Sequence, residues 1–348
     1  MRIAIIGCGA MGTILGAYLA KNGKTVEMID NNAYHVNKMR EDGAKVIGYD
    51  NFQVPVNAIL PSEMRGIYDI VFLFTKQTSN HIVLPHLLNY IDENSVVCTL
   101  QNGVPETAVS EIIGKERTTG GTTNWSATFV EPGISELTQD LEKTPYLFEI
   151  GEIDGKITDR INTIAEILGT MGKPTKISTE LMASRWSKVV LNACVSGMSA
   201  VCGITFGEVL DNDKSRACAI HIGYEVKKAC EAEGYNLPLF NGKYSLDGLA
   251  LENQEMFEEV QRLFIDLYSI VKGGKASMLQ DLEKGMVTEV TMINGHVSKT
   301  GAKYGIPTPF NNKVVEIVQK IEKGEITYSL DNLNFFDDGL FKFAKLSL

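Results

Sequence analysis

The sequence is short of positive charge and of long apolar stretches. Its 348 residues include 33 lysines and arginines against 43 aspartates and glutamates, giving a net charge of −10. A surface with this balance repels nucleic-acid phosphates, so we expect no nucleic-acid partner. No apolar run approaches the ~20 residues of a membrane-spanning helix, so we expect no membrane partner. The amino-terminal residues lack the layout of a signal peptide, which predicts a cytoplasmic protein.

Cysteine pairs at metal-binding or redox spacing are also absent. The six cysteines are scattered, no two form a C-x-x-C pair, and none has a histidine at metal-ligand spacing. They are Cys8, Cys98, Cys194, Cys202, Cys218 and Cys230. This pattern predicts small buried thiols in a reducing compartment and neither a zinc site nor a disulfide framework. We expect the protein to need no metal.

The first twelve residues, MRIAIIGCGAMG, determine how the rest of the chain is interpreted. Residues 3–6 form a short apolar run typical of a buried parallel strand, and a helical pattern that ends near Gly23 follows the glycines. A strand, a Gly-x-Gly-x-x-Gly turn and a helix make the dinucleotide-binding fingerprint, in which the diphosphate lies at the start of the helix. A glycine-rich turn without a ligand is the alternative, and the flanking strand and helix argue against it. The predicted cofactor contacts are Gly7, Cys8, Gly9, Ala10, Met11 and Gly12.

Asp30 ends the second expected strand, TVEMID, at the spacing of an acid that binds a ribose 2′-hydroxyl. A carboxylate at this position repels a 2′-phosphate, and the neighbouring Asn31 and Asn32 supply no arginine to bind one. The sequence therefore favours NAD over NADP as the cofactor. The alternative is that Asp30 is a solvated acid at the end of a strand.

Two further expected strands, at 69–75 and 95–100, end in polar residues. In an open parallel sheet, ligands bind beyond the carboxyl ends of the strands. We therefore expect cofactor contacts from Thr75 and Lys76 after the first of these strands, and from Asn102 and Gly103 after the second.

The pattern changes near residue 178. Before it, strands alternate with helices; after 180, long helical stretches follow one another, including a predicted run over 277–303. With 44% hydrophobic and 22% charged residues, the composition is that of a globular protein, and the length suits two domains. The sequence predicts an α/β fold: an N-terminal Rossmann-type domain over 1–178 and an all-helical domain over 179–348. A cleft between domains is the usual place for an active site.

The helix predicted over 180–201 carries Lys188, Asn192 and Ser196 at i, i+4 and i+8, which places them on one face. A lysine in an otherwise apolar helix is costly unless it is paired or used, and partial burial lowers its pKa. Lys188 could then protonate a carbonyl oxygen as a hydride arrives. A lysine that extends from the helix edge into solvent is the alternative.

A second polar cluster lies in SMLQDLEKGMVTEVTMING. Ser277 and Gln280 fit a capping box, which predicts that a helix begins at Ser277 and offers its N–H groups to a substrate carboxylate. Glu289 follows twelve residues later, ~18 Å along an unbroken helix. If both contact one small substrate, the helix must break, and Gly285 is the natural place. The alternative for Glu289 is an exposed acid at a helix start.

These segments together resemble the ketopantoate reductases (2-dehydropantoate 2-reductases). GCGAMG, Lys76, LQNGV, the W-x-K-x-x-x-N helix, SMLQD and TEVTMING occur in the family's order, and the resemblance covers almost the whole chain. It implies reduction of a small 2-oxo acid by a nicotinamide cofactor, NAD or NADP. It implies that Lys188 donates the proton to the ketone oxygen, that Glu289 orients the substrate, and that Asn102 lies beside the nicotinamide and the lysine. Asn192 and Ser277 match substrate-binding positions, with Ser277 on the carboxylate.

The chain departs from the family pattern at two substrate positions. Ser196 and Phe206 stand where the family has asparagines. Because lost hydrogen-bonding partners change specificity strongly, a less polar branched or aromatic 2-oxo acid becomes an alternative to ketopantoate, as in the related NAD-dependent D-2-hydroxyacid dehydrogenases. Ser196 remains a predicted substrate contact. Residues 237–272 form a longer segment than usual, which could cover the cleft or form a dimer contact.

The sequence thus predicts a homodimeric enzyme. Two rival functions remain: another Rossmann enzyme such as a 3-hydroxyacid dehydrogenase, and a non-catalytic NAD-binding sensor or scaffold. The helical domain offers few arginines for a phosphorylated substrate, and a sensor does not require lysine, glutamate and asparagine together.

Overall fold

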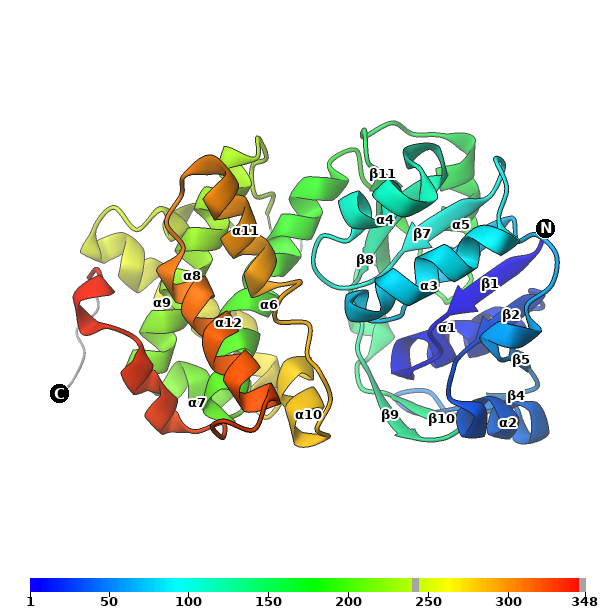
Figure 1. Ribbon diagram of the computed structural model, residues 1–348, viewed down its shortest axis with the longest axis horizontal. Coiled ribbons are helices and arrows are strands. Elements are labelled where there is room, and N and C mark those ends of the chain that lie inside the picture. The colour runs from blue at the N-terminus through cyan, green and yellow to red at the C-terminus, as the bar shows by residue number, and fades with distance from the viewer. Residues whose placement is uncertain (240–243, 344–348) are drawn as a thin grey trace. The chain divides into compact units, whose positions relative to one another are not determined.

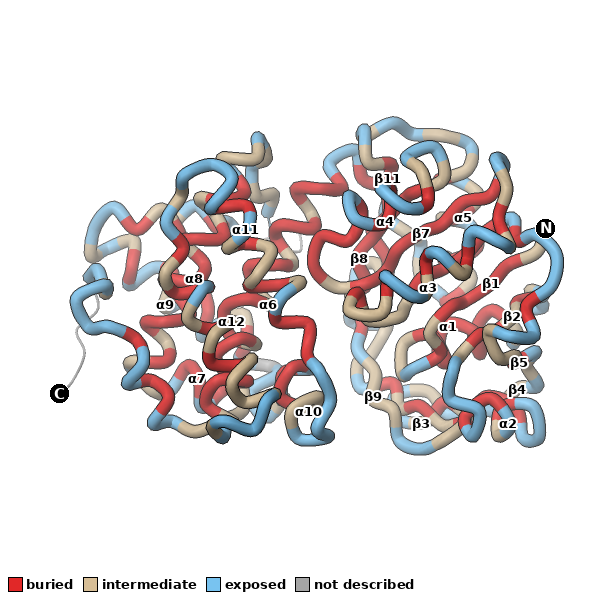
Figure 2. Tube along the Cα trace, in the orientation of Figure 1, coloured by how far each residue is buried: buried red, intermediate tan, exposed pale blue. Residues whose placement is uncertain are grey.

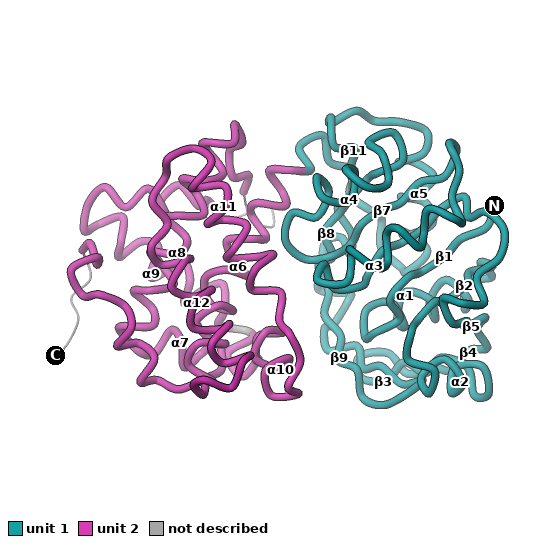
Figure 3. Tube along the Cα trace, in the orientation of Figure 1, with its two compact units in different colours: residues 1–181 teal, residues 182–348 magenta. Residues whose placement is uncertain are grey.

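The computed structural model describes residues 1–239 and 244–343, and it divides into two compact units, Met1–Leu181 and Met182–Leu348 (Figure 3). The division falls at Leu181, whereas the sequence placed it at 178. The first unit is an α/β sheet structure and the second is built from helices (Figure 1). The predicted fold class is confirmed.

An eight-stranded sheet forms the centre of the first unit, in the order β12-β11-β8-β7-β6-β1-β2-β5. Its strands pair in parallel except where β11 runs antiparallel to β8. The strands are β1 (Ile3–Ile6), β2 (Val26–Ile29), β5 (Asn57–Ile59), β6 (Ile70–Leu73), β7 (Val96–Thr99), β8 (Thr118–Thr123), β11 (Phe148–Glu152) and β12 (Lys176–Ile177). Every residue of β1, β6 and β7 is buried, as expected for parallel strands covered on both faces (Figure 2).

Helices cover both faces of this sheet. They are α1 (Ala10–Lys21), α2 (Ala33–Asp42), α3 (Asn80–Leu87), α4 (Glu106–Ile113) and α5 (Asp159–Gly169). Because side chains alternate along a strand, Ile3 and Ile5 of β1 join the core that contains α1 and α5. Ala4 and Ile6 join the second core, which contains α3 and α4.

A smaller sheet packs beside α1, in the order β4-β3-β10-β9. Its strands are β3 (Ala44–Gly48), β4 (Phe52–Val54), β9 (Ala127–Glu131) and β10 (Ile134–Leu137). The sequence predicted short strands in both regions, with a break at Pro132-Gly133, and Gly133 has a φ of +82° in the turn. It gave no sign that β3 and β10 pair, since local patterns do not report contacts between distant segments.

The second unit contains α6 (Leu181–Cys202), α7 (Phe206–Asp211), α8 (Asp213–Ala232), α9 (Gln254–Tyr268), α10 (Ser277–Glu283), α11 (Asn294–Tyr304) and α12 (Pro309–Glu322). The predicted helical run over 277–303 is wrong as one element: α10 ends at Glu283, and Gly285 has a φ of +64°. The break therefore falls at Gly285, where the sequence analysis expected it if Ser277 and Glu289 contact the same substrate. Helix α7 was not predicted.

All six cysteines are buried and unpaired. No helix among the described residues is long and apolar enough to cross a membrane. In the same residues, no group of three histidine, cysteine, aspartate or glutamate side chains is placed to hold a metal ion.

A buried polar network joins four helices of the second unit. The carboxylate of Glu225 on α8 accepts the backbone N–H groups of Phe310 and Asn311 at the start of α12, each at 2.9 Å. The Asn311 side chain donates to Glu225 at 2.8 Å and accepts from Asn294 on α11 at 2.9 Å. Asn294 also donates to the carbonyl of Ala193 on α6 at 3.1 Å. The network therefore fixes α6 against α8, α11 and α12.

Replacing Asn311 by alanine should destabilise the second unit. Asn311→Ala leaves buried partners of the network without hydrogen bonds, which costs about 2 kcal/mol or more. Asn312→Ala is the matched control, because Asn312 is exposed and its side chain accepts a long hydrogen bond, at 3.5 Å, from the Thr308 hydroxyl. Thermal and urea unfolding should show a clear loss for the first variant and a change within about 0.5 kcal/mol for the second. Equal effects would contradict a structural role for the network.

Candidate functional site

The glycine-rich turn after β1 has little room for side chains. Gly7 has a φ of +93°, and a Cβ there would lie 2.6 Å from the Thr75 nitrogen. A Cβ on Gly12 would lie 2.2 Å from the Gly7 carbonyl oxygen. These close approaches require glycine at both positions, as the fingerprint predicts.

Gly9 differs from the other two glycines of the turn. It is exposed, it precedes the first residue of α1, and no side chain caps the helix there. A Cβ built on Gly9 would meet nothing within 4 Å. The start of α1 thus borders open space at an uncapped, electropositive helix end, which fits a diphosphate. Ala10 and Met11 are partly exposed beside it, whereas Cys8 and Gly12 are buried.

The Asp30 carboxylate holds this turn in place. One oxygen accepts the Cys8 N–H at 2.8 Å, and the other accepts the Asn32 N–H at 2.9 Å. Asp30 is therefore more than a solvated acid at the end of a strand. It is partly exposed, and each carboxylate oxygen has capacity for a further hydrogen bond, so a ribose hydroxyl could also bind.

Two glutamines connect the loops that follow β6 and β7. The side chain of Gln101 donates to the Thr75 carbonyl and to Asn80, each at 2.7 Å. The side chain of Gln77 donates to the Asn102 carbonyl at 2.5 Å. The structure therefore brings the loop containing Thr75 and Lys76 together with the loop containing Asn102 and Gly103. The sequence predicted no contact for either glutamine, although Gln101 lies two residues after β7 and Gln77 four residues after β6.

Accessibility differs among the residues predicted in these loops. Thr75, Lys76 and Asn102 are partly exposed. Gly103 is buried and has a φ of +77°. Gly103 thus shapes the turn, and Thr75 and Asn102 are accessible, whereas the Lys76 Nζ atom itself is buried.

In the second unit, α6 has the polar face that the sequence predicted. Lys188, Asn192 and Ser196 are each partly exposed. Most apolar residues between them are buried, namely Val189, Val190, Ala193 and Val195, while Leu191 is partly exposed. The three polar side chains lie along one accessible strip of a largely buried helix.

The electrostatic environment of Lys188 favours its neutral form. Burial and the positive charge of Arg185 lower the pKa of Lys188, and the carboxylate of Glu289 raises it in part, leaving a pKa of about 7. Arg185 lies on α6 three residues before Lys188 and is only 1% exposed. The sequence analysis did not single out Arg185, although a second cationic residue in the same apolar helix could have indicated its role.

Glu289 lies in the segment between α10 and α11 and is 7% exposed. The alternative of an exposed acid at a helix start is therefore wrong. The preceding Thr288 donates its backbone N–H and its hydroxyl to Glu322 on α12, both at 2.7 Å. This anchor and the break at Gly285 fix the segment that carries Glu289, whose carboxylate raises the pKa of Lys188.

Ser277 is exposed and is the first residue of α10. The predicted capping box is wrong, because Ala276 is the N-cap and no side chain caps the helix. The Gln280 side chain donates to the Lys275 carbonyl at 3.2 Å. The Ser277 hydroxyl is therefore not committed to a helix cap.

Phe206 lies at the start of α7, with its ring edge-on to that of Tyr268 at 5.4 Å. The Tyr268 hydroxyl donates to the carbonyl of Leu191 at 3.2 Å, one residue before Asn192. An aromatic pair therefore contacts α6 beside its polar strip. Tyr268 belongs to the longer 237–272 segment, of which residues 240–243 lie outside the described residues.

Two family models match the chain, one for each unit. Residues 3–152 match the model described as ketopantoate reductase PanE/ApbA, and residues 180–322 match its C-terminal counterpart. The chain belongs to the ketopantoate reductase family. As a ketopantoate reductase family member, it is an NAD(P)-dependent oxidoreductase that acts on a 2-oxo acid.

The chain aligns with similar proteins over nearly the full length of both partners. The chain is 28% identical to the 2-dehydropantoate 2-reductase of Archaeoglobus fulgidus, over 93% of this chain and 98% of that protein. A solved 2-dehydropantoate 2-reductase from Geobacter metallireducens is 26% identical, with a TM-score of 0.76 over 92% of this chain and 99% of that one. D-mandelate dehydrogenase in a ternary structure with NADH and anilino(oxo)acetate is 25% identical, with a TM-score of 0.80 over 93% and 99%.

Substitutions at two glycines should separate folding from cofactor binding in this ketopantoate reductase family member. Gly12→Ala places a methyl group against the Gly7 carbonyl and should destabilise the first unit by about 2–3 kcal/mol. Gly9→Ala has room in the structure and should leave the melting temperature nearly unchanged. The methyl group would occupy the space that a diphosphate approaches, so the Kd for NADH should rise about tenfold or more, or ~1.4 kcal/mol. Unchanged NADH binding by Gly9→Ala would argue against this turn as the diphosphate site.

Proposed function

We propose that the first unit binds NADH in preference to NADPH and that the second unit binds and protonates a 2-oxo acid with an apolar side chain. The proposal rests on the partly exposed Lys188, which lies on the polar strip of α6 with the buried carboxylate of Glu289 nearby. Burial and Arg185 lower the pKa of Lys188 to about 7, and Glu289 acts against them. A proton donor works best when its pKa lies close to the working pH, because it can then both give up and regain its proton.

When bound, the nicotinamide cofactor supplies the hydride that reduces the ketone carbon. Negative charge then develops on the ketone oxygen, and the Lys188 ammonium group donates a proton to it. Glu289 keeps part of the Lys188 population protonated by opposing the effects of burial and Arg185. Lys188 is thus the proposed catalytic acid, and Glu289 sets its protonation and helps to orient the substrate.

The remaining predicted residues have binding roles in this proposal. Asn192 and Ser196, on the same strip of α6, contact the substrate, and Ser277 binds its carboxylate. In the first unit, Asn102 contacts the nicotinamide, and Thr75, Lys76 and Gly103 complete the cofactor contacts together with the glycine-rich turn. Because the enzyme would already hold the cofactor and substrate in position, they would lose little further entropy on reaching the transition state. This positioning contributes strongly to the rate.

The preference for NADH rests on the residues after β2. Asp30 is the acid at the end of this strand, and the exposed Asn31 and Asn32 add no positive charge to attract a 2′-phosphate. D-mandelate dehydrogenase, which is 25% identical to this chain, has been solved with NADH.

The preference for an apolar substrate side chain rests on Ser196 and Phe206. Phe206 packs against Tyr268 beside the polar strip, and neither it nor Ser196 supplies the amide that a hydroxylated substrate would use. The ligand anilino(oxo)acetate in the D-mandelate dehydrogenase structure is an aromatic 2-oxo acid derivative, which is consistent with this preference. The homodimer remains a prediction, which the mass of the protein in solution tests.

A panel of cofactors and 2-oxo acids tests the proposed specificity. NADH and NADPH oxidation should be followed at 340 nm with ketopantoate, 2-oxoisovalerate, 2-oxoisocaproate and phenylglyoxylate. We expect the highest kcat/KM with NADH and one of the three less polar acids. The highest value with NADPH and ketopantoate would overturn both preferences. NADH binding without turnover of any 2-oxo acid would favour the sensor function.

The rate of reduction should depend on the protonation of Lys188. Because the donor must carry a proton, kcat for reduction should be highest below pH 7 and fall as the pH rises through about 7. Lys188→Ala should lower kcat by ~10²-fold or more with the Kd for NADH nearly unchanged. Turnover that survives in Lys188→Ala would remove the lysine from the mechanism.

Glu289→Gln provides the control for this pH dependence. The substitution removes the negative charge that raises the pKa of Lys188, so the fall in kcat should move to lower pH. A pH profile that keeps its position in Glu289→Gln would show that the titration belongs to another group.

A further inference from the structure

His35 lies behind the glycine-rich turn, and the proposed function gives it no role. It is the third residue of α2 and is only 1% exposed. Its backbone N–H donates to the Asn32 side chain at 3.2 Å, which fixes the start of the helix. Its ring packs edge-on to Phe129 of β9 at 5.1 Å.

Both ring nitrogens of His35 have backbone partners. The Gly133 N–H donates to Nδ1 at 2.9 Å, and Nε2 lies 2.7 Å from the Cys8 carbonyl oxygen. Because a backbone N–H can only donate, Nδ1 must accept, and the ring proton is on Nε2. The His35 ring therefore donates to Cys8 in its neutral form. Burial lowers the pKa of His35, against opposing effects of the Cys8 carbonyl and Asp30, which agrees with a neutral ring.

The Cys8 carbonyl belongs to the peptide group that also contains the Gly9 N–H. This carbonyl accepts a second hydrogen bond from the Thr13 hydroxyl at 2.6 Å. In a trans peptide, the C=O and N–H groups point in opposite directions. Two donors that hold the Cys8 carbonyl toward the interior therefore direct the Gly9 N–H outward, where Gly9 is exposed.

We propose that His35 is a positioning residue of the cofactor site, which orients the Cys8–Gly9 peptide so that the Gly9 N–H faces the cofactor diphosphate. The proposal rests on the proposed function, since it takes the glycine-rich turn as the diphosphate site. It adds a residue from outside the fingerprint to the machinery that binds the cofactor.

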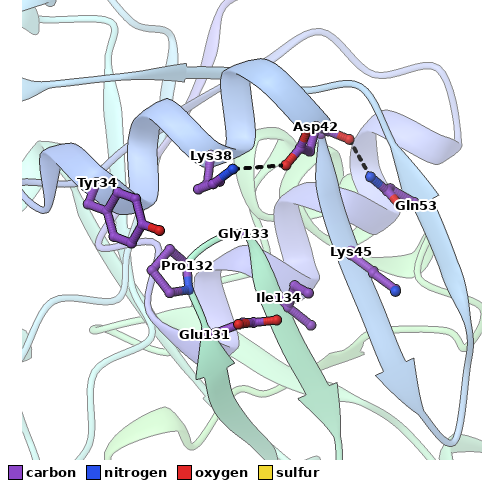
Figure 4. A pocket seen from close by; sticks show the side chains of 10 residues that line it. Tyr34, Lys38, Asp42, Lys45, Gln53, Glu131, Pro132, Gly133 and Ile134 are labelled. Atoms are coloured by element: carbon purple, nitrogen blue, oxygen red, sulfur yellow. Dashed lines mark hydrogen bonds and ion pairs between the residues drawn. The ribbon is translucent and has the colours of Figure 1, made fainter.

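The second sheet fixes the orientation of the His35 ring. Gly133 lies in the turn between β9 and β10, which Figure 4 shows beside Tyr34 and Lys38 of α2. The same turn borders a pocket of about 360 Å³, whose walls also include Asp42, Lys45 and Gln53 (Figure 4). Gly133 has a φ of +82°, so the position of its N–H depends on a conformation that favours glycine. The ring thus connects this turn to the cofactor turn.

Two amide substitutions separate the two contacts of the ring. In His35→Gln, the side-chain amide nitrogen reaches the position of Nε2 and can still donate to Cys8. In His35→Asn, the side-chain oxygen reaches the position of Nδ1 and can still accept from Gly133, but the bond to Cys8 is lost. We expect His35→Gln to keep the Kd for NADH within about twofold and His35→Asn to raise it about five- to tenfold, as for one lost hydrogen bond.

The KM for NADH should follow these changes in Kd, and kcat at saturating NADH should stay unchanged in both variants. A purely structural role predicts instead that both variants lose stability and that NADH affinity does not distinguish them. Equal affinities in the two variants, or weaker binding by His35→Gln than by His35→Asn, would overturn the proposal.

Thr13→Val tests the same orientation of the Cys8–Gly9 peptide if a His35 variant fails to fold. Valine has nearly the shape of threonine but lacks the second donor to the Cys8 carbonyl, so it should also weaken NADH binding severalfold with kcat unchanged. Unchanged affinity in this variant would overturn the proposal. If the wild-type protein itself binds no NADH, the proposed function fails; if it binds and the variants do not differ, only the role of His35 fails.

Discussion

Two positive charges lie three residues apart on a largely buried helix, and the site in the second unit depends on how they are balanced. Arg185 and burial both disfavour the charged form of Lys188, and Glu289 opposes them. Without an acid at this place, the pKa of Lys188 would fall further, and less of the lysine would carry a proton at neutral pH. Much of the second unit can be understood as the framework that keeps this carboxylate near α6.

That framework depends on interrupting a helix. The left-handed conformation at Gly285 ends the run that began at Ser277, and Thr288 is then held by Glu322 of α12. Asn294 begins the next helix and is bound both to Asn311 and to the Ala193 carbonyl on α6. The segment containing Glu289 is thus fixed at both ends by hydrogen bonds between helices, which limits its movement relative to Lys188.

The sequence predicted the fold class and most elements of the first unit because its signals are local. The strand at residues 3–6, the glycines and Asp30 lie within thirty residues and follow a known pattern. The polar face of α6 was also predictable, since a spacing of four residues determines a helical face. The interpretation of Ser277 as part of a capping box was wrong because Ser277 is the first residue of the helix, and Ala276, which has no capping side chain, occupies the N-cap position. Gln101, Arg185 and His35 were missed because their importance comes from partners on other elements, which no local pattern reports.

The pairing of His35 with Gly133 has a consequence for synthesis of the protein. The two residues are 98 positions apart, and the strands on either side of Gly133 pair with each other and with β3. A nascent chain that has just left the ribosome with its first fifty residues carries the whole nucleotide fingerprint but lacks the segment that fixes the ring behind it. Long-range contacts of this kind form late because the intervening chain must first be ordered. The contact that orients the His35 ring behind the glycine-rich turn can therefore form only after Gly133 has been synthesised.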